Sequence, residues 1–249
     1  MKIILDAQKR KVEILNREEG HLNEDDGYDC PKCRNRGRFF VVSENGCMAV
    51  RECECMAVRR SKRFLKKSGL ADMVGRYTLE TWRKVEPFQQ VAEDVVMRYI
   101  ARHDGWLLVS GNPGTGKTHI CTAACLELIN SGIETRYMLW RDVSTRAKAA
   151  VNDATEYARI VDPLKTVRCL YIDDLFKCGK GQEPTVGDVN LAFEILNYRY
   201  NDSRLYTIIS TERSAEELLD IDEAVGSRIY ERSKGYYLDF AGRQNWRIK

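Results

Sequence analysis

The run from Gly111 to Thr118 has the residue types and the spacing of a phosphate-binding loop. It reads G-x-x-x-x-G-K-T and follows the apolar run Trp106–Val109, which we predict to be a buried strand. Glycines let backbone N–H groups turn toward phosphate oxygens, and the start of the next helix adds its partial positive charge. In this pattern the lysine reaches the β- and γ-phosphates, and the threonine hydroxyl binds Mg²⁺. The predicted ATP and Mg²⁺ site is formed by Gly111, Asn112, Pro113, Gly114, Thr115, Gly116, Lys117 and Thr118.

Two adjacent acids supply the second half of such a site. Asp173 and Asp174 lie near the end of the apolar run 168–176, about 55 residues after the loop. We expect Asp173 to belong to the Mg²⁺ shell and Asp174 to act as the general base that orients the attacking water. Many ATPases have glutamate at the second position, and because aspartate is shorter we expect slow hydrolysis. After the strand predicted at 206–211, Glu212 or Thr211 is expected to sense the γ-phosphate.

Two arginines near the C-terminus are spaced for one helix face. Arg228 and Arg232 are four residues apart, about one helix after the predicted sensor strand. Ring- or filament-forming ATPases place there an arginine finger, which reaches the γ-phosphate of the neighbouring subunit and stabilises transition-state charge. Arg228 follows Gly226 and Ser227 at the predicted exposed start of the helix, so we favour it as the finger. Arg232 is then a helper or an interface ion-pair partner, and a solvated arginine face is the alternative.

Cysteines near the N-terminus have the spacing of a structural zinc site. A C-x-x-C pair and a C-x-C pair flank a predicted hairpin whose turn is Ser-Glu-Asn-Gly. Four thiolates fit a tetrahedral zinc ion, and a segment this short would gain much of its folding free energy from the metal. Cys47 or His21 could replace one ligand, and reduced cysteines in a packed hairpin are the alternative. The predicted ligands are Cys30, Cys33, Cys53 and Cys55.

Charge is unevenly spread along the chain. The net charge is +3, but the first 85 residues carry 19 lysines and arginines against 13 acids. Part of this excess is a basic run that we predict to be a helix ending near Gly69. The run could meet nucleic-acid phosphates or an acidic protein surface, or it could be a solvated linker helix. Its basic residues are Arg59, Arg60, Lys62, Arg63, Lys66 and Lys67.

The sequence also bears on the cellular compartment. The N-terminus is interrupted by charge and has no apolar core of signal-peptide length, and nowhere do 18 apolar residues run together. We therefore expect a protein of the reducing cytoplasm without a membrane span. Nine cysteines in that compartment argue for metal binding or buried thiols and against disulfides.

The elements that must position these residues alternate between strand and helix. A long helix is predicted at 187–202, and this alternation predicts an α/β fold with a parallel five-stranded sheet and helices on both faces. We expect one strand to lie between the phosphate-loop strand and the strand that carries the two acids. The predicted strands are 106–109, 135–140, 168–176, 206–211 and 236–240.

The chain divides in this interpretation into three parts. Residues 1–69 form a zinc-binding module with the basic helix, and residues 87–249 form an ATPase domain. Residues 70–86 form a linker, in which YTLETW (77–82) is a strap that leads into the second domain.

The chain resembles the DnaC/DnaI family of AAA+ helicase loaders, especially the versions carried by Gram-positive phages and prophages. The likeness runs from about Tyr28 to the end, through YDCPKC and CEC, YTLETW, SGNPGTGKTH, YIDDLF, LNYRYND, TIISTERSAEELLDIDEAVGSRIYER and GRQNWR. The resemblance implies an N-terminal zinc module that docks on the replicative helicase. It also implies a C-terminal P-loop ATPase that binds single-stranded DNA, lacks the helical lid of most AAA+ proteins and acts as a homo-oligomer. Many relatives have asparagine where this chain has Glu212, which affects how hydrolysis is signalled.

The resemblance therefore predicts an ATP-dependent loader of the replicative helicase, whose ATPase serves as a slow assembly switch. One alternative is a transposition helper ATPase of the IstB kind, which shares nearly the same ATPase core. Another is an ATP-dependent DNA-binding switch that scarcely hydrolyses ATP.

Overall fold

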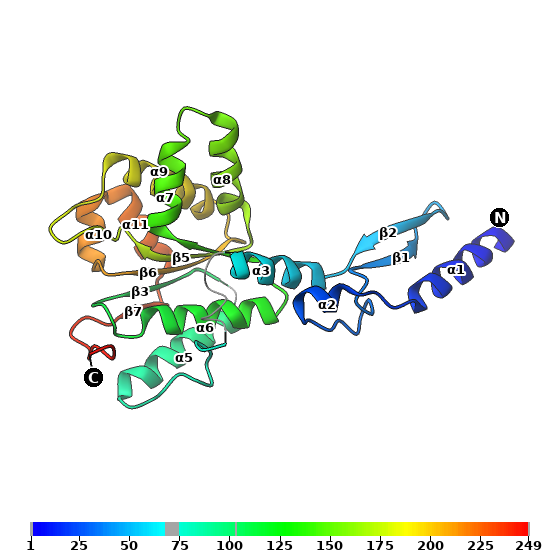
Figure 1. Cartoon of the computed structure of the whole chain (residues 1–249), viewed down its shortest axis with the longest axis horizontal. Coiled ribbons are helices and arrows are strands. Elements are labelled where there is room, and N and C mark those ends of the chain that lie inside the picture. Colours follow the sequence, from blue (N-terminus) through cyan, green and yellow to red (C-terminus); the bar gives the residue numbers. More distant parts are fainter. Residues whose placement is uncertain (1, 68–74, 103, 249) are drawn as a thin grey trace. The chain divides into compact units, whose positions relative to one another are not determined.

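The computed structural model describes residues 2–67, 75–102 and 104–248. The chain separates into two compact units, residues 1–63 and 64–249 (Figure 1). The boundary between the units falls within helix α3 (Cys55–Lys67). The helix end predicted near Gly69 lies outside the described residues.

The first unit is built around a small hairpin, as predicted. Strand β1 (Arg38–Val42) pairs antiparallel with β2 (Met48–Glu52), and the Ser-Glu-Asn-Gly turn connects them. Helices α1 (Lys2–Arg17) and α2 (Leu22–Asp26) precede the hairpin. The side-chain amide of Asn16, near the end of α1, donates to the Phe40 carbonyl at 2.8 Å and accepts from the Phe40 N–H at 3.0 Å. These two hydrogen bonds attach α1 to the edge of β1 that does not pair with β2.

The second unit contains the five-stranded parallel sheet that the alternation of elements predicts. The strand order is β4-β5-β6-β3-β7, and each neighbouring pair is parallel. One strand, β6, separates β3 from β5, as predicted. Because parallel strands end at the same edge, this order brings the carboxyl ends of β3, β5 and β6 together. The strands are β3 (Trp106–Ser110), β4 (Thr135–Leu139), β5 (Cys169–Leu175), β6 (Tyr206–Thr211) and β7 (Tyr237–Asp239).

Helices cover both faces of this sheet and make three layers (Figure 1). Helices α5 and α6 lie on one face, and α7 to α11 lie on the other. Among the described residues no helix follows β7. The helices are α5 (Pro87–Arg102), α6 (Lys117–Asn130), α7 (Trp140–Ala149), α8 (Ala154–Thr166), α9 (Val186–Tyr200), α10 (Ala215–Ile221) and α11 (Glu223–Arg232).

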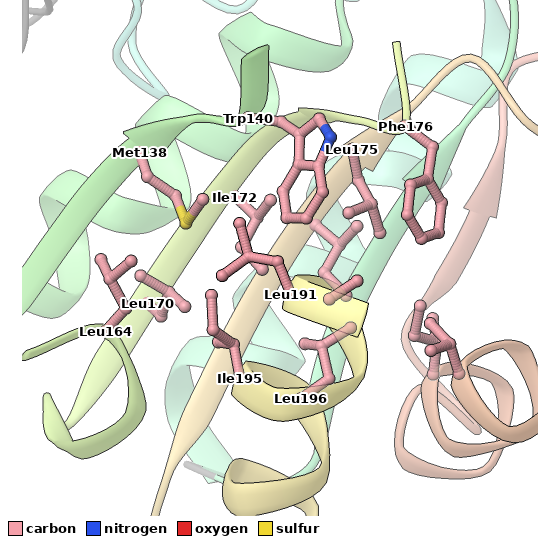
Figure 2. Packing of buried hydrophobic residues seen from close by; sticks show 14 of the residues in the cluster. Met138, Trp140, Leu164, Leu170, Ile172, Leu175, Phe176, Leu191, Ile195 and Leu196 are labelled. Atoms are coloured by element: carbon pink, nitrogen blue, oxygen red, sulfur yellow. The ribbon is translucent and has the colours of Figure 1, made fainter. Parts of the chain in front are cut away.

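The main apolar core lies between the sheet and the helices of the second face. Figure 2 shows Leu191, Ile195 and Leu196 of α9 facing the apolar side chains of β5, among them Leu170 and Ile172. All five side chains are buried, with exposures of at most 3%. Helix α9, predicted at 187–202, is therefore held to the sheet by its apolar face, and its packing fixes the strand ends that carry the polar residues.

The described part of the predicted linker, residues 75–86, belongs to the second unit. Tyr77 stacks on the ring of His119 with centroids 4.9 Å apart, and Trp82 meets the same ring edge-on at 5.1 Å. The Trp82 indole N–H donates to the Gln89 carbonyl of α5 at 2.9 Å. The strap is thus packed against the first turn of α6, next to the phosphate loop.

Candidate nucleotide and metal sites

The phosphate loop has the backbone that its glycines were predicted to allow. Gly114 and Gly116 have φ angles of 78° and 101°, a region that residues with a Cβ rarely adopt. A Cβ on Gly116 would lie 3.0 Å from the Trp82 ring, so a larger residue would also press against the strap. The ammonium group of Lys117 donates to the carbonyls of Gly111 at 2.7 Å and Asn112 at 2.9 Å, and burial lowers its pKa. The loop and its lysine form a compact cradle at the start of α6.

Oxygen ligands suited to Mg²⁺ converge beside this cradle. The Thr118 hydroxyl lies 3.4 Å from Asp173 Oδ1, so the two residues predicted to share the ion are neighbours. Asp173 is 4% exposed and accepts from Tyr171 at 2.9 Å, from Tyr137 at 3.1 Å and from Ser210. Burial raises the pKa of Asp173, and these hydroxyl donors partly offset that effect. A hydroxyl and a fixed carboxylate are the hard oxygen donors that Mg²⁺ prefers, so the donor set fits the ion.

The second acid is held by Lys177, which lies outside the predicted motifs. The ammonium group of Lys177 lies 3.0 Å from Asp174 Oδ2 and 2.7 Å from Glu212 Oε1. Thr211, the alternative sensor, is fully buried and donates its hydroxyl to the Leu175 carbonyl at 2.8 Å. Of the two sensor candidates, only Glu212 lines the cavity described next. The strand ends therefore bring Asp174 and Glu212 together through a shared lysine.

A cavity of about 570 Å³ lies against the phosphate loop, within the usual size range of small-molecule sites. One wall consists of the loop and the acids, and the other consists of the strap and the C-terminal segment. Trp246 is tied to the loop, because its backbone N–H donates to the Gly114 carbonyl at 3.0 Å. The lining residues include Tyr77, Thr81, Trp82, Gln89, Lys117, Thr118, His119, Asp174, Lys177, Glu212, Trp246 and Arg247.

The arginine pair lies on α11 as predicted, but the prediction that Arg228 marks an exposed helix start is wrong. Arg228 lies in the second half of the helix and is half-buried. It donates to Asn197 Oδ1 at 3.0 Å and to the Ala224 carbonyl, and it packs over the Phe193 ring at 5.2 Å. Arg232 is the last residue of α11 and packs over the Trp106 ring at 5.9 Å. Its Nε and Nη2 are buried without a hydrogen-bond partner among the described residues.

The four predicted cysteines meet in the first unit, and their sulfur atoms all lie within 4.8 Å of one another. Cys30 and Cys53 are 3.8 Å apart at sulfur, and Cys33 and Cys55 are 3.6 Å apart. With Zn–S bonds of about 2.3 Å, the corners of a tetrahedral site are about 3.8 Å apart. These spacings fit a zinc ion.

The thiols of the cluster differ in their pKa values. Burial raises the pKa of the Cys33 thiol, but the Gly37 N–H and the neighbouring thiols outweigh burial and lower it to about 7, whereas burial raises the pKa values of the Cys53 and Cys55 thiols. The two alternative ligands lie outside the cluster. Cys47 is exposed in the hairpin turn, and the exposed His21 ring faces Glu24 at 3.2 Å.

The basic run is only partly available to a partner. Arg59 is 1% exposed; its guanidinium pairs with Asp26 at 2.5 Å and donates to the Tyr28 carbonyl at 2.9 Å. Arg60 pairs with Glu52 at 2.8 Å. The expectation that Arg59 belongs to a solvent-facing basic surface is wrong, because this arginine holds α3 to the segment around α2.

Sequence reasoning missed three further groups that line the cavity. The strap residues carried a signal, since the aromatic rings in YTLETW must be buried somewhere. Trp246 also carried this signal, because an aromatic ring among the polar residues of the C-terminal segment is expected to pack against something. No sequence pattern pointed to Lys177, because its second carboxylate partner, Glu212, follows the neighbouring strand β6 and is distant in the chain.

Fold and site together define a P-loop nucleoside triphosphatase of the AAA+ class. The sheet order, the loop between β3 and α6, and the acids at the end of β5 carry this conclusion. The part of the chain that the structure describes contains no helix long and apolar enough to cross a membrane.

The chain belongs to the family described as IstB-like ATP binding protein, which matches residues 47–232. It is 30% identical over 251 residues to the phage-like element PBSX protein XkdC of Bacillus subtilis (strain 168), covering 96% of this chain and 92% of that protein. It is 28% identical over 131 residues to the replicative helicase loader DnaC of Escherichia coli (strain K12), covering 51% of this chain and 53% of DnaC. The crystal structure of the DnaC helicase loader has the same fold, with a TM-score of 0.59 and 23% identity over 67% of this chain and 98% of that chain.

Proposed function

We propose that this protein is an ATP-dependent loader of a replicative DNA helicase and that it binds single-stranded DNA. The observation that carries the proposal is the pairing of two sites in separate units, the ATPase site and the four-cysteine module. An ATPase core serves many tasks, whereas an added module of this size supplies a surface for one partner. The likeness to DnaC supports the choice of a helicase as that partner.

In the proposed reaction, the loop N–H groups and Lys117 bind the phosphates of ATP. Mg²⁺ would be held by Thr118 and Asp173, and bound there it would neutralise phosphate charge. Asp174 orients the attacking water and accepts its proton. Because aspartate is shorter than glutamate, turnover is slow, and ATP acts mainly as a signal for assembly.

Two variants separate binding from turnover. Lys117→Ala should weaken ATP binding, because a phosphate contact is lost. Asp174→Asn should bind ATP like wild type but hydrolyse it about 100-fold more slowly. Equal turnover by Asp174→Asn and wild type would exclude Asp174 as the base.

We also propose that the cysteine cluster binds one structural Zn²⁺ and that this module contacts the helicase. The partner is tested by co-purification with the replicative helicase of the host, comparing wild type with Cys30→Ser. Loss of helicase binding with retained ATP binding is expected. If wild type does not bind the helicase, the loader proposal fails.

Single-stranded DNA binding is proposed to use the basic run through Lys66 and Lys67 and the loops at the carboxyl edge of the sheet. If phosphate contacts dominate, affinity should fall steeply as the salt concentration rises. Reversal of both lysines to glutamate should reduce DNA affinity. Unchanged DNA affinity with lost helicase binding would instead assign the run to the protein partner.

The arginine finger is proposed to act in a homo-oligomer, with Arg228 or Arg232 as the donor; Arg228 is tested first, although its exposed position was not found. In the single chain Arg228 is bonded to Asn197, so assembly must redirect it. Arg228→Ala should bind ATP normally and lose turnover in the assembly. Mixing it with Lys117→Ala should restore part of the turnover, because an intact arginine again faces an intact loop. If both variants assemble and mixing restores nothing, the finger is excluded.

The family match is equally compatible with one competing function, a transposition helper ATPase of the IstB kind. That protein would assemble on DNA with a transposase and would not need a helicase. The co-purification experiment separates the two functions. A switch that scarcely hydrolyses ATP is separated by measuring steady-state turnover with and without single-stranded DNA.

A further inference from the structure

Lys177 connects two strand ends of the ATPase site. Its ammonium group lies 3.0 Å from Asp174 Oδ2, near the carboxyl end of β5, and 2.7 Å from Glu212 Oε1, directly after β6. The three side chains are 38%, 23% and 30% exposed, so the group is partly shielded from water. All three line the cavity beside the phosphate loop.

The backbone holds this group in place. The Lys177 N–H donates to the Asp174 carbonyl at 3.0 Å and closes a turn. Asp174 itself has a φ angle of 57°, which is uncommon for a residue with a Cβ. Its N–H donates to Ser210 Oγ at 3.0 Å, and that hydroxyl donates to Asp173. Asp174 is thus fixed at its backbone to β6 and at its carboxylate to Lys177.

The charges explain why a cation is needed between these acids. Asp173, Asp174 and Glu212 surround the end of the site that would face the γ-phosphate, and each would repel the others and the nucleotide when ionised. Burial lowers the pKa of Lys177, but its bonds to Glu212 and Asp174 outweigh burial and raise it, so the amine stays protonated. Lys117 points its ammonium group at loop carbonyls and makes no hydrogen bond to these acids among the described contacts.

We propose that Lys177 is a positioning residue for ATP hydrolysis: its ammonium group orients the Asp174 carboxylate and couples it to Glu212. The proposal rests on the proposed hydrolysis of ATP at this site. A carboxylate held at one oxygen keeps the other oxygen free for a water molecule. Because Glu212 shares the same ammonium group, repulsion between the Glu212 carboxylate and the γ-phosphate of bound ATP changes how firmly Lys177 holds the base.

A surface ion pair of the ordinary kind would have little effect, since exposed pairs contribute little and are easily replaced. This group differs because one cation joins two carboxylates from neighbouring strands and because the backbone of Asp174 is held in a restricted conformation. Loss of the cation therefore changes the direction of the base without changing the phosphate cradle. The effect belongs in kcat, and the affinity for ATP should change little.

The test uses the full chain and compares Lys177→Met with wild type, with Lys180→Met as the control. Lys180 is an exposed lysine in the same loop. We expect Lys177→Met to lower kcat about tenfold, as displacement of a catalytic group does, with ATP affinity within about twofold of wild type. Lys177→Arg should recover part of the rate, and Lys180→Met should match wild type. Circular dichroism and thermal unfolding establish that the variants are folded.

The coupling to Glu212 is tested by a double-mutant cycle with Glu212→Gln. If Lys177 carries the coupling, Glu212→Gln has a smaller effect on kcat in the Lys177→Met background than in wild type. If Glu212→Gln changes kcat by the same factor in wild type and in Lys177→Met, the coupling is refuted.

Three results overturn the role of Lys177 itself: unchanged kcat in Lys177→Met, increased kcat, or a lost affinity for ATP with kcat retained. The last result would make Lys177 a phosphate ligand. A wild-type protein that binds ATP and never hydrolyses it, with or without helicase and single-stranded DNA, overturns both the proposed hydrolysis and this inference. An active wild type with an equally active Lys177→Met overturns the inference alone.

Discussion

Gly226 determines how closely α11 approaches α10, and we expect Gly226→Ala to separate the two helices. A Cβ at this position would lie 2.7 Å from the Leu218 carbonyl oxygen and 2.7 Å from the Leu219 nitrogen. These are backbone atoms, so no flexible side chain can move aside. The variant keeps both arginines of α11 and changes only the position of the helix that carries them.

The expected size follows from two opposing terms. Alanine is favoured over glycine inside a helix by about 1 kcal/mol. Overpacking a core costs about 1–3 kcal/mol, and the upper part of that range applies when the obstacle is backbone. The net loss is then about 1–2 kcal/mol, which corresponds to a fall in Tm of about 2–8 °C for a unit of this size.

Thermal unfolding followed by circular dichroism measures this loss, with Ser227→Ala as the matched control. Ser227 is the exposed neighbour in the same helix, so its replacement by alanine should leave Tm unchanged or raise it slightly. ATP binding by Gly226→Ala should be close to wild type, because α11 contributes no residue to the cavity lining. If Gly226→Ala is as stable as Ser227→Ala, the close packing of α10 on α11 is not a constraint and the reasoning is refuted.

Three other predictions follow from the same structure. Purified protein should contain about one Zn²⁺ per chain, and Cys30→Ser should make the first unit sensitive to protease; a metal-free protein with a resistant first unit would contradict this. The Lys148 ammonium and the α9 cap outweigh burial and lower the pKa of Asp188, so its contribution to stability is present above about pH 4 and is lost as the pH falls through its lowered pKa. Urea unfolding of wild type and Asp188→Asn should therefore differ at pH 7 and converge only as the pH falls through the lowered pKa of Asp188, and a constant difference would exclude the ionised cap. Arg199 is fully buried and donates to backbone carbonyls at the C-terminal end of α8, so Arg199→Met should lose on the order of 3 kcal/mol in the same assay, whereas a loss below about 1 kcal/mol would show that water replaces those bonds.

Motifs that lie close together in the chain could be assigned from the sequence. The phosphate loop, the two acids at the end of β5 and the C-x-x-C and C-x-C pairs each require only local spacing. The strand and helix pattern was also sufficient for the parallel sheet, because apolar runs of strand length alternate with segments of helical period. These predictions depend on residues that lie close together in the chain, and their types and spacing can be read from a single sequence.

Only the tertiary structure decided which polar groups face one another. Glu212 meets Asp174 through Lys177 because β6 lies beside β5, and the ends of parallel strands adjoin at one edge of the sheet. Arg228 is half-buried because α9 and its aromatic residues pack against α11, although its own neighbours in sequence suggested an exposed position. Arg59 is likewise a buried structural residue within a basic run, because a distant aspartate accepts from it. The charge, burial and orientation of a side chain depend on elements distant in sequence, and these properties decide whether a residue of the right type takes part in a site.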